Sequence, residues 1–162
     1  RNRISQAKGA AHKLLRHSYV KRDRVAIVGF RGTRAQVLLP PSKSMLRASR
    51  VLDSLAVGGG TPLSAGLRCS LEVAKRVRSD GAQVVLLLFT DGQANVAVRA
   101  NGNGSRSPRH VIEKEIASLG LELRRLGVQT VVVDTQNEFV ASHNARFLAE
   151  QLSGTYQRLR NY

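Results

Sequence analysis

The sequence predicts an α/β fold, a doubly wound and mostly parallel sheet in a three-layer α/β/α arrangement. Short apolar runs at 25–30, 84–89 and 128–133 have the composition of strands that are covered on both faces. Segments with apolar residues at helical spacing separate these runs, and this alternation is typical of parallel sheets whose crossovers are helices. The chain has 162 residues, enough for one domain over 1–162. We therefore expect the three runs to form the centre of one parallel sheet.

The first half of the chain predicts a helix over 3–18, a strand over 25–30 and a second strand over 36–39. Pro40 and Pro41 are expected to end that second strand, and Ser42 to cap the helix that follows. A third helix is predicted to begin at Thr61, with Thr61 as its cap and Pro62 at its first helical position. Its buried stripe is expected to comprise Leu63, Leu67, Leu71 and Ala74.

The second half begins with the run 84–89, the most strand-like in the chain, which we predict to be a central parallel strand. Residues 99–107 have the composition of a loop. A helix is expected from Pro108 to Gly127, then a strand over 128–133, a short helix over 145–152 and an edge strand over 155–159. The residues expected to be buried on the long helix are Ile112, Ile116, Leu119, Leu123 and Leu126.

Charge predicts an acidic partner. The sequence has 26 Lys and Arg against 11 Asp and Glu, a formal net charge of +15, and 13 of the 26 lie in residues 1–50 beside a single acid, Asp23. Aromatic residues for base stacking are few, with 3 Tyr, 4 Phe and no Trp. An acidic protein surface is therefore favoured, and a basic nucleic-acid-binding domain is the alternative. The candidate partner-binding residues are Arg22, Arg24, Arg31 and Gly32.

The sequence disfavours a membrane protein, a phosphate-binding protein and an enzyme with a histidine-based catalytic site. No apolar run approaches the ~18 residues needed to span a bilayer, so no membrane contact is expected. Gly58 to Gly60 follows a helix and lacks the lysine of a phosphate-binding loop. The four histidines have no Cys or Ser partner at motif spacing, and the single Cys69 sits in an apolar segment typical of a reduced core thiol. No catalytic residue is predicted in this domain.

A metal site is predicted at the carboxyl edge of the sheet. Asp91 and Asp134 close two consecutive parallel strands, and ligands of such sheets bind outside the strands' carboxyl ends. The loop that carries Thr61 is directed to the same place. One carboxylate with hydroxyls and retained water suits Mg²⁺, and a partner's carboxylate could complete its shell. On spacing alone, an Asp-Gly turn accounts for Asp91 equally well, and loop capping for Asp134, which is a candidate only for supporting the site indirectly.

Two motifs carry a resemblance. Gly59-Gly60-Thr61-Pro62-Leu63 and Leu88-Phe89-Thr90-Asp91-Gly92 resemble the second and third elements of the metal-ion-dependent adhesion site of von Willebrand A domains. Thr61 and Asp91 map to its threonine and aspartate. The first element, Asp-x-Ser-x-Ser at the end of the first strand, is absent from this sequence. We therefore expect a partial domain that lacks the first central strand, with a gap or exposed apolar surface in its sheet.

Longer blocks resemble the carboxy-terminal domain of the magnesium chelatase D subunit, in the same order along nearly the whole chain. Thr33 stands where that family is expected to have an acid, and residues 96–108 do not match. The matching blocks are Asn2-Arg3-Ile4, 6–10, Phe30-Arg31-Gly32, 37–42, 58–63, Thr90-Asp91-Gly92-Gln93-Ala94-Asn95 and 133–140.

The resemblance implies a docking and coupling role in ATP-dependent insertion of Mg²⁺ into protoporphyrin IX, the entry to chlorophyll synthesis. ATP would bind in a missing amino-terminal part of the parent or in the I-type ATPase subunit, and the H-type subunit would hold the porphyrin. The family's acidic linker would be a counter-charge for the basic amino-terminal third. The implied location is the bacterial cytoplasm or the plastid stroma. The cobalt chelatase of cobalamin synthesis is the alternative, less favoured by the blocks at 90–95 and 134–137.

Overall fold

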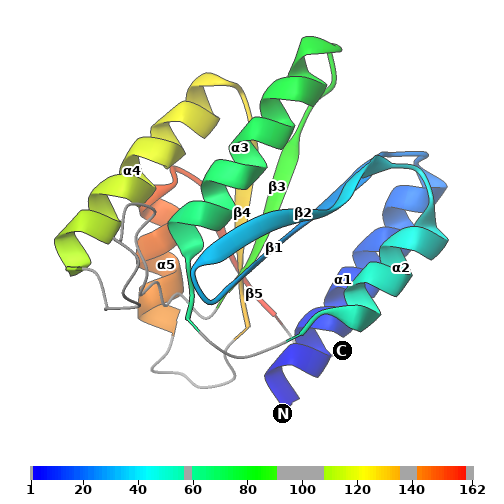
Figure 1. Cartoon of the computed structure of the whole chain (residues 1–162), viewed down its shortest axis with the longest axis horizontal. Coiled ribbons are helices and arrows are strands. Elements are labelled where there is room, and N and C mark those ends of the chain that lie inside the picture. The colour runs from blue at the N-terminus through cyan, green and yellow to red at the C-terminus, as the bar shows by residue number, and fades with distance from the viewer. Residues whose placement is uncertain (1, 57–59, 91–107, 136–141, 160–162) are drawn as a thin grey trace.

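A computed structural model describes residues 2–56, 60–90, 108–135 and 142–159, with only the backbone for 2–4 and 142 (Figure 1). Five helices and five strands are described. In chain order they are α1 (Asn2–Val20), β1 (Val25–Arg31), β2 (Arg34–Ser42), α2 (Met45–Ser54), α3 (Leu63–Ser79), β3 (Val85–Thr90), α4 (Arg109–Arg125), β4 (Gln129–Asp134), α5 (Ser142–Gln151) and β5 (Thr155–Arg158). None of these helices is long and apolar enough to cross a membrane.

The described strands form two sheets. One has the order β3-β4-β5 and is parallel throughout, with Val85 opposite Gln129 and Thr90 opposite Asp134. The other is the antiparallel hairpin β1-β2. The prediction that 25–30 lies in one parallel sheet with the other two runs is therefore wrong for the described residues. A short turn at Gly32 pairs β1 with its neighbour in sequence instead, which is the pairing with the least loop to close.

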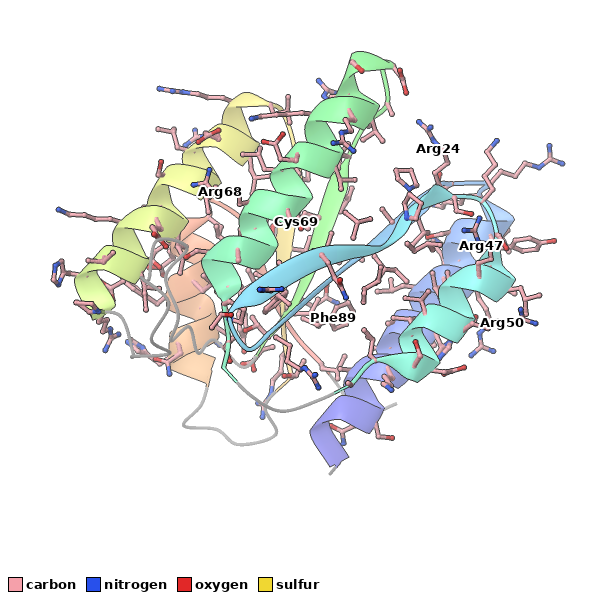
Figure 2. All side chains as sticks on the ribbon, viewed as in Figure 1. Arg24, Arg47, Arg50, Arg68, Cys69 and Phe89 are labelled. Atoms are coloured by element: carbon pink, nitrogen blue, oxygen red, sulfur yellow. The ribbon has the colours of Figure 1, made fainter. Side chains whose placement is uncertain are left out.

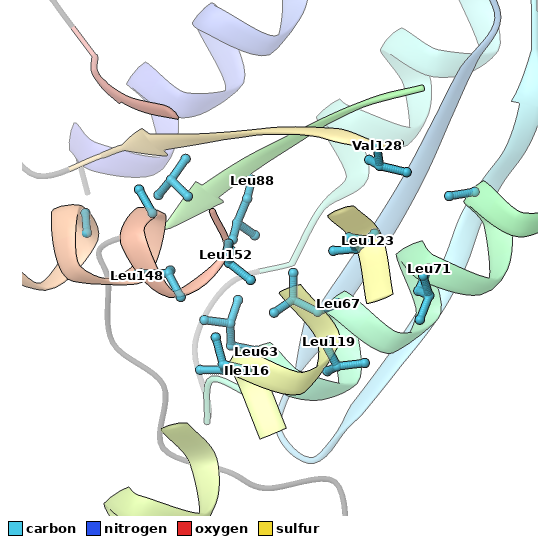
Figure 3. Close-up of a cluster of buried hydrophobic side chains, with 14 of the residues drawn as sticks. Leu63, Leu67, Leu71, Leu88, Ile116, Leu119, Leu123, Val128, Leu148 and Leu152 are labelled. Carbon is cyan, nitrogen blue, oxygen red and sulfur yellow. The ribbon is translucent and has the colours of Figure 1, made fainter. Parts of the chain in front are cut away.

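One large core joins the parallel sheet to three helices (Figure 3). α3, α4 and α5 direct their apolar stripes at the same face of β3 and β4, and the predicted stripe of α3 is buried as expected. The members drawn with labels are Leu63, Leu67, Leu71, Leu88, Ile116, Leu119, Leu123, Val128, Leu148 and Leu152. Leu126, predicted to be buried, is only partly so because it ends the helix.

A smaller core lies between the hairpin and the first two helices. Leu15 of α1, Leu39 of β2, and Ala48 and Leu52 of α2 are its buried members. The other face of the hairpin meets α3, where Phe30 packs so closely on Gly66 that a Cβ there would lie 2.6 Å from its ring. The hairpin is thus a layer between α1 and α2 on one side and α3 on the other (Figure 1).

The run 85–90 is an edge strand among the described residues, and not the central strand that was predicted. It is hydrogen-bonded to β4 on one side only. Val85 is 55% exposed and Leu87 37% exposed, while Leu88 and Thr90 on the opposite face are buried. The expected break in the sheet with exposed apolar surface is therefore present at β3.

Three local predictions need correction. β2 continues through Pro40 and Pro41 to Ser42, because an outer strand with a shifted register does not need every backbone donor. Ser44 caps α2 by accepting from the backbone nitrogen of Arg47 at 3.3 Å, whereas Ser42 accepts from the nitrogen of Ser44. α3 begins at Leu63, one residue later than predicted, with Pro62 at its cap position.

Candidate functional site

Two of the candidate metal-site residues, Thr61 and Asp134, can be located in the structure relative to the carboxyl edge of the parallel sheet. β3 and β4 end together, with Thr90 opposite Asp134, and the backbone nitrogen of Thr135 donates to the carbonyl of Thr90 at 3.0 Å. α3 runs antiparallel to β3, so the amino end of this helix, preceded by Thr61, lies at the same edge (Figure 1). Asp91, which follows Thr90, lies outside the described residues. The predicted approach of Thr61 to Asp91 thus stays a prediction.

The turn of the β1-β2 hairpin lies beside the loop that carries Thr61. The backbone nitrogen of Gly32 donates to the carbonyl of Gly60 at 3.1 Å. Gly32 has φ +65°, a backbone conformation that glycine adopts without strain. Arg31, the last residue of β1, is exposed next to this contact. These two predicted partner-binding residues therefore flank the candidate metal edge.

Arg22 and Arg24 lie elsewhere. Both precede β1, and Arg31 is its last residue, so they lie at the other end of this seven-residue strand from Arg31. At about 3.3 Å per residue this is a separation on the order of 20 Å. The four predicted partner-binding residues accordingly form two groups at opposite ends of β1.

Asp134, the last residue of β4, is buried and contacts Tyr156 of the neighbouring strand β5. Its side chain is 1% exposed, and its Oδ2 accepts a hydrogen bond from Tyr156 Oη at 2.9 Å. The guanidinium of Arg146 lies 4.9 Å from the centre of the Tyr156 ring. Burial first, and then the hydrogen bond and charge of Asp134, raise the pKa of Tyr156, and Arg146 partly offsets this. Asp134 thus anchors β5 and α5 to the end of β4.

Sequence reasoning missed Ser64. Its side chain is fully buried one residue into α3, and no described residue hydrogen-bonds its Oγ. A buried hydroxyl without a hydrogen-bond partner is unfavourable. We therefore expect the Ser64 hydroxyl to have a partner outside the residues that the structure describes. The sequence feature that could have identified Ser64 as a candidate is its position between Leu63 and Leu67 of the buried stripe, three residues after Thr61.

The donors at this edge are all oxygens, which fits Mg²⁺. Thr61 and Ser64 carry hydroxyls near the amino end of α3, and the predicted direct carboxylate is that of Asp91, whereas Asp134 is engaged with Tyr156. Thr61 already has a polar interaction with its surroundings. Within the described ranges no three His, Cys, Asp or Glu side chains come together as a metal cluster.

Comparison with known proteins agrees with this architecture. Residues 1–93, more than half of the chain, match the von Willebrand factor type A domain. The chain belongs to the von Willebrand factor type A domain family. The structure also resembles that of a conserved hypothetical protein, BatB, from Bacteroides thetaiotaomicron, with a TM-score of 0.64, 16% identity, and 98% of this chain and 80% of that chain covered. At this identity the likeness concerns the fold alone.

Two relatives of this von Willebrand A chain are much larger proteins. It is 43% identical over 163 residues to the magnesium-chelatase 67 kDa subunit of Chlorobaculum parvum, covering 99% of this chain and 26% of that protein. It is 39% identical over 135 residues to the magnesium-chelatase 60 kDa subunit of Cereibacter sphaeroides, covering 83% of this chain and 23% of that protein. The chain therefore spans about a quarter of the length of these relatives.

Proposed function

We propose that this chain is a docking and coupling domain of a magnesium chelatase D subunit, in a protein that supports ATP-dependent insertion of Mg²⁺ into protoporphyrin IX for chlorophyll synthesis. The observation that carries the proposal is 43% identity over 99% of the chain to a magnesium-chelatase 67 kDa subunit. The partners would be the other chelatase subunits, I-type and H-type, and the compartment the bacterial cytoplasm or the plastid stroma. A role in cobalt chelatase is less favoured because the two relatives described above are magnesium-chelatase subunits.

The docking contact is proposed at the carboxyl edge of the sheet. Thr61 and Asp91 would hold Mg²⁺ there, with Ser64 as a further oxygen donor close to Thr61. Mg²⁺ supplies a site for a partner's carboxylate, because it accepts an additional oxygen ligand in place of water. Gly32 ties the β1-β2 turn to Gly60 at 3.1 Å, so the exposed Arg31 is well placed to meet an acidic partner next to that carboxylate.

The test is a binding titration of the full-length protein with its I-type partner subunit, in Mg²⁺ and in EDTA. Thr61→Ala removes the hydroxyl, and Thr61→Ser is the matched control because it keeps the oxygen and loses only a methyl group. We expect EDTA, Asp91→Ala and Thr61→Ala each to weaken binding by about 10- to 100-fold, and Thr61→Ser to stay within about twofold of wild type. ATPase-ring assembly should be unchanged in all variants, since no residue of this edge is proposed to act in it.

Two outcomes would overturn the metal contact. Equal affinity of wild type and all variants, with and without EDTA, would mean that the subunits meet through another surface. A steep loss of affinity with salt but no response to EDTA would move the contact to the basic residues. Tight binding of unrelated DNA duplexes with the same salt dependence would favour the nucleic-acid alternative that the +15 charge allows.

A further inference from the structure

A second surface lies where α1 ends and α2 begins, and it exposes large apolar side chains. Tyr19 is 60% exposed, Val20 80% and Leu46 62%. These are among the most exposed large hydrophobic residues that the structure describes. Side chains of this kind gathered at one end of two adjacent helices indicate a contact site rather than scattered surface.

The same place is densely cationic. Six exposed basic residues belong to it, and Asp23 is the acid that lies among them. Within the described part of the chain none of the six forms a salt bridge. They are Lys21, Arg22, Arg24, Lys43, Arg47 and Arg50. We call these six residues, with Tyr19, Val20 and Leu46, the α1–α2 surface.

The end of α1 and the start of α2 meet at this surface around a small depression. Tyr19 and Asp23 line it from the α1 side, and Lys43 and Met45 from the α2 side. On α2, Leu46 and Arg50 are one helical turn apart, so the exposed leucine and arginine stand side by side. Figure 2 shows Arg24, Arg47 and Arg50 on the same side of the molecule, away from Arg68 on α3.

We propose that the α1–α2 surface binds an acidic peptide segment of a partner protein, in which apolar side chains alternate with carboxylates. The carboxylates would meet the unpaired arginines and lysines, and an apolar side chain of the segment would cover Leu46 and Tyr19. A purely electrostatic ligand would leave those two side chains in water. A nucleic acid fits less well because Tyr19 is the surface's single aromatic residue, and stacking of successive bases needs several.

This contact is separate from the carboxyl edge of the sheet. Arg24 precedes β1 and Arg31 is its last residue, so the two places lie at opposite ends of this strand. The α1–α2 surface brings no metal ligand with it. Binding there is therefore expected to be insensitive to EDTA, and its failure is distinguishable from failure of the metal-mediated contact.

The test uses the full chain and a fluorescein-labelled octapeptide in which two leucines are flanked by six acidic residues, measured by fluorescence anisotropy at low salt. The variant Arg47→Gln/Arg50→Gln removes two charges of the surface. The matched control Arg68→Gln/Arg76→Gln removes two exposed charges from α3, with the same change in net charge and the same helix propensity. We expect the first pair to weaken binding by about 2- to 30-fold and the control pair to stay within about twofold.

Leu46→Ala tests the apolar half of the proposal. Because Leu46 is 62% exposed, covering it should contribute to affinity, and its loss should weaken binding by about 3- to 10-fold with no change in charge. Replacing the peptide's leucines by serine should remove this sensitivity.

Four results would overturn the proposal. They are equal losses in the two arginine pairs, no effect of Leu46→Ala, abolition of binding by EDTA, and tighter binding of a single-stranded oligonucleotide of equal charge that is unaffected by Leu46→Ala. The first would mean non-specific attraction, the third would place the peptide at the metal edge, and the last would assign the surface to nucleic acid.

Discussion

Tyr156→Phe isolates one hydrogen bond at the end of the parallel sheet. The substitution removes only Oη, which donates to Asp134 Oδ2 at 2.9 Å. The ring stays in place, so no cavity forms and the contact with Arg146, 4.9 Å from the ring centre, is kept. Any change in stability therefore reports on the hydroxyl and the buried carboxylate.

The expected magnitude follows from the burial of Asp134. A hydrogen bond to a charged group contributes about 1.5–3 kcal/mol, more than one between neutral groups, because the carboxylate is left without a donor when the bond is lost. Asp134 is 1% exposed, so water does not replace the lost donor. It has a further interaction, however, which keeps the carboxylate from being wholly unpartnered. We expect a loss in free energy of unfolding near the lower end of that range.

The pH dependence has a definite sign. The pKa of Tyr156 is raised above its ordinary value near 10.0, first by burial and then by Asp134, so the folded protein holds this proton more tightly than the unfolded chain does. The stability that the hydroxyl contributes is fully present below about pH 10 and is lost as pH rises through the folded-state pKa. The difference between wild type and Tyr156→Phe should accordingly be constant from pH 7 to about 9 and shrink above about 10.

The assay is urea denaturation followed by circular dichroism over this pH series. In an Asp134→Ala background, Tyr156→Phe should change stability by less than about 0.5 kcal/mol, because the acceptor is already gone. A loss below about 0.5 kcal/mol in the wild-type background, or a difference that grows above pH 10, would refute the reasoning.

Two further predictions concern packing. Gly120→Ala should destabilise the protein by about 1–3 kcal/mol, because a Cβ there would lie 2.8 Å from the carbonyl oxygen of Gln151. Gly9→Ala should instead stabilise helix α1 by about 0.5–1 kcal/mol, because a Cβ there would have no atom within 4 Å. Thermal denaturation of both variants checks the opposite signs, and a gain from Gly120→Ala would show that α4 and α5 can move apart. Leu67 is 1% exposed, so Leu67→Ala should lower the free energy of unfolding by about 2–5 kcal/mol. Leu121 is 47% exposed, so Leu121→Ala should lower it by less than about 1 kcal/mol. Urea denaturation of this pair measures the contrast, and similar losses at the two sites would contradict the assignment of the core.

The local pattern of apolar and polar residues was sufficient to predict the individual helices and strands. The apolar stripe of α3 and the runs that became β1, β3 and β4 could be read from the spacing of side chains, because periodicity reports which side of an element is buried. It does not report what covers that side. The run 85–90 reads as a strand buried on both faces, yet Val85 and Leu87 are exposed, since burial depends on neighbours that are remote in sequence.

By itself, the sequence determined the α/β class and the order of helices and strands. It also contains the motifs that make Thr61 and Asp91 candidate ligands of one metal ion. Only the tertiary structure decided that β1 pairs with β2 and that Tyr156 donates a hydrogen bond to Asp134. It also decided that Arg31 and Gly32 lie beside the loop that carries Thr61, while Arg22 and Arg24 lie at the other end of β1. The physical reason is the range of the forces involved. Helix and strand preferences act between residues a few positions apart, whereas the partner of a buried carboxylate 22 positions away is chosen by the packing of whole elements.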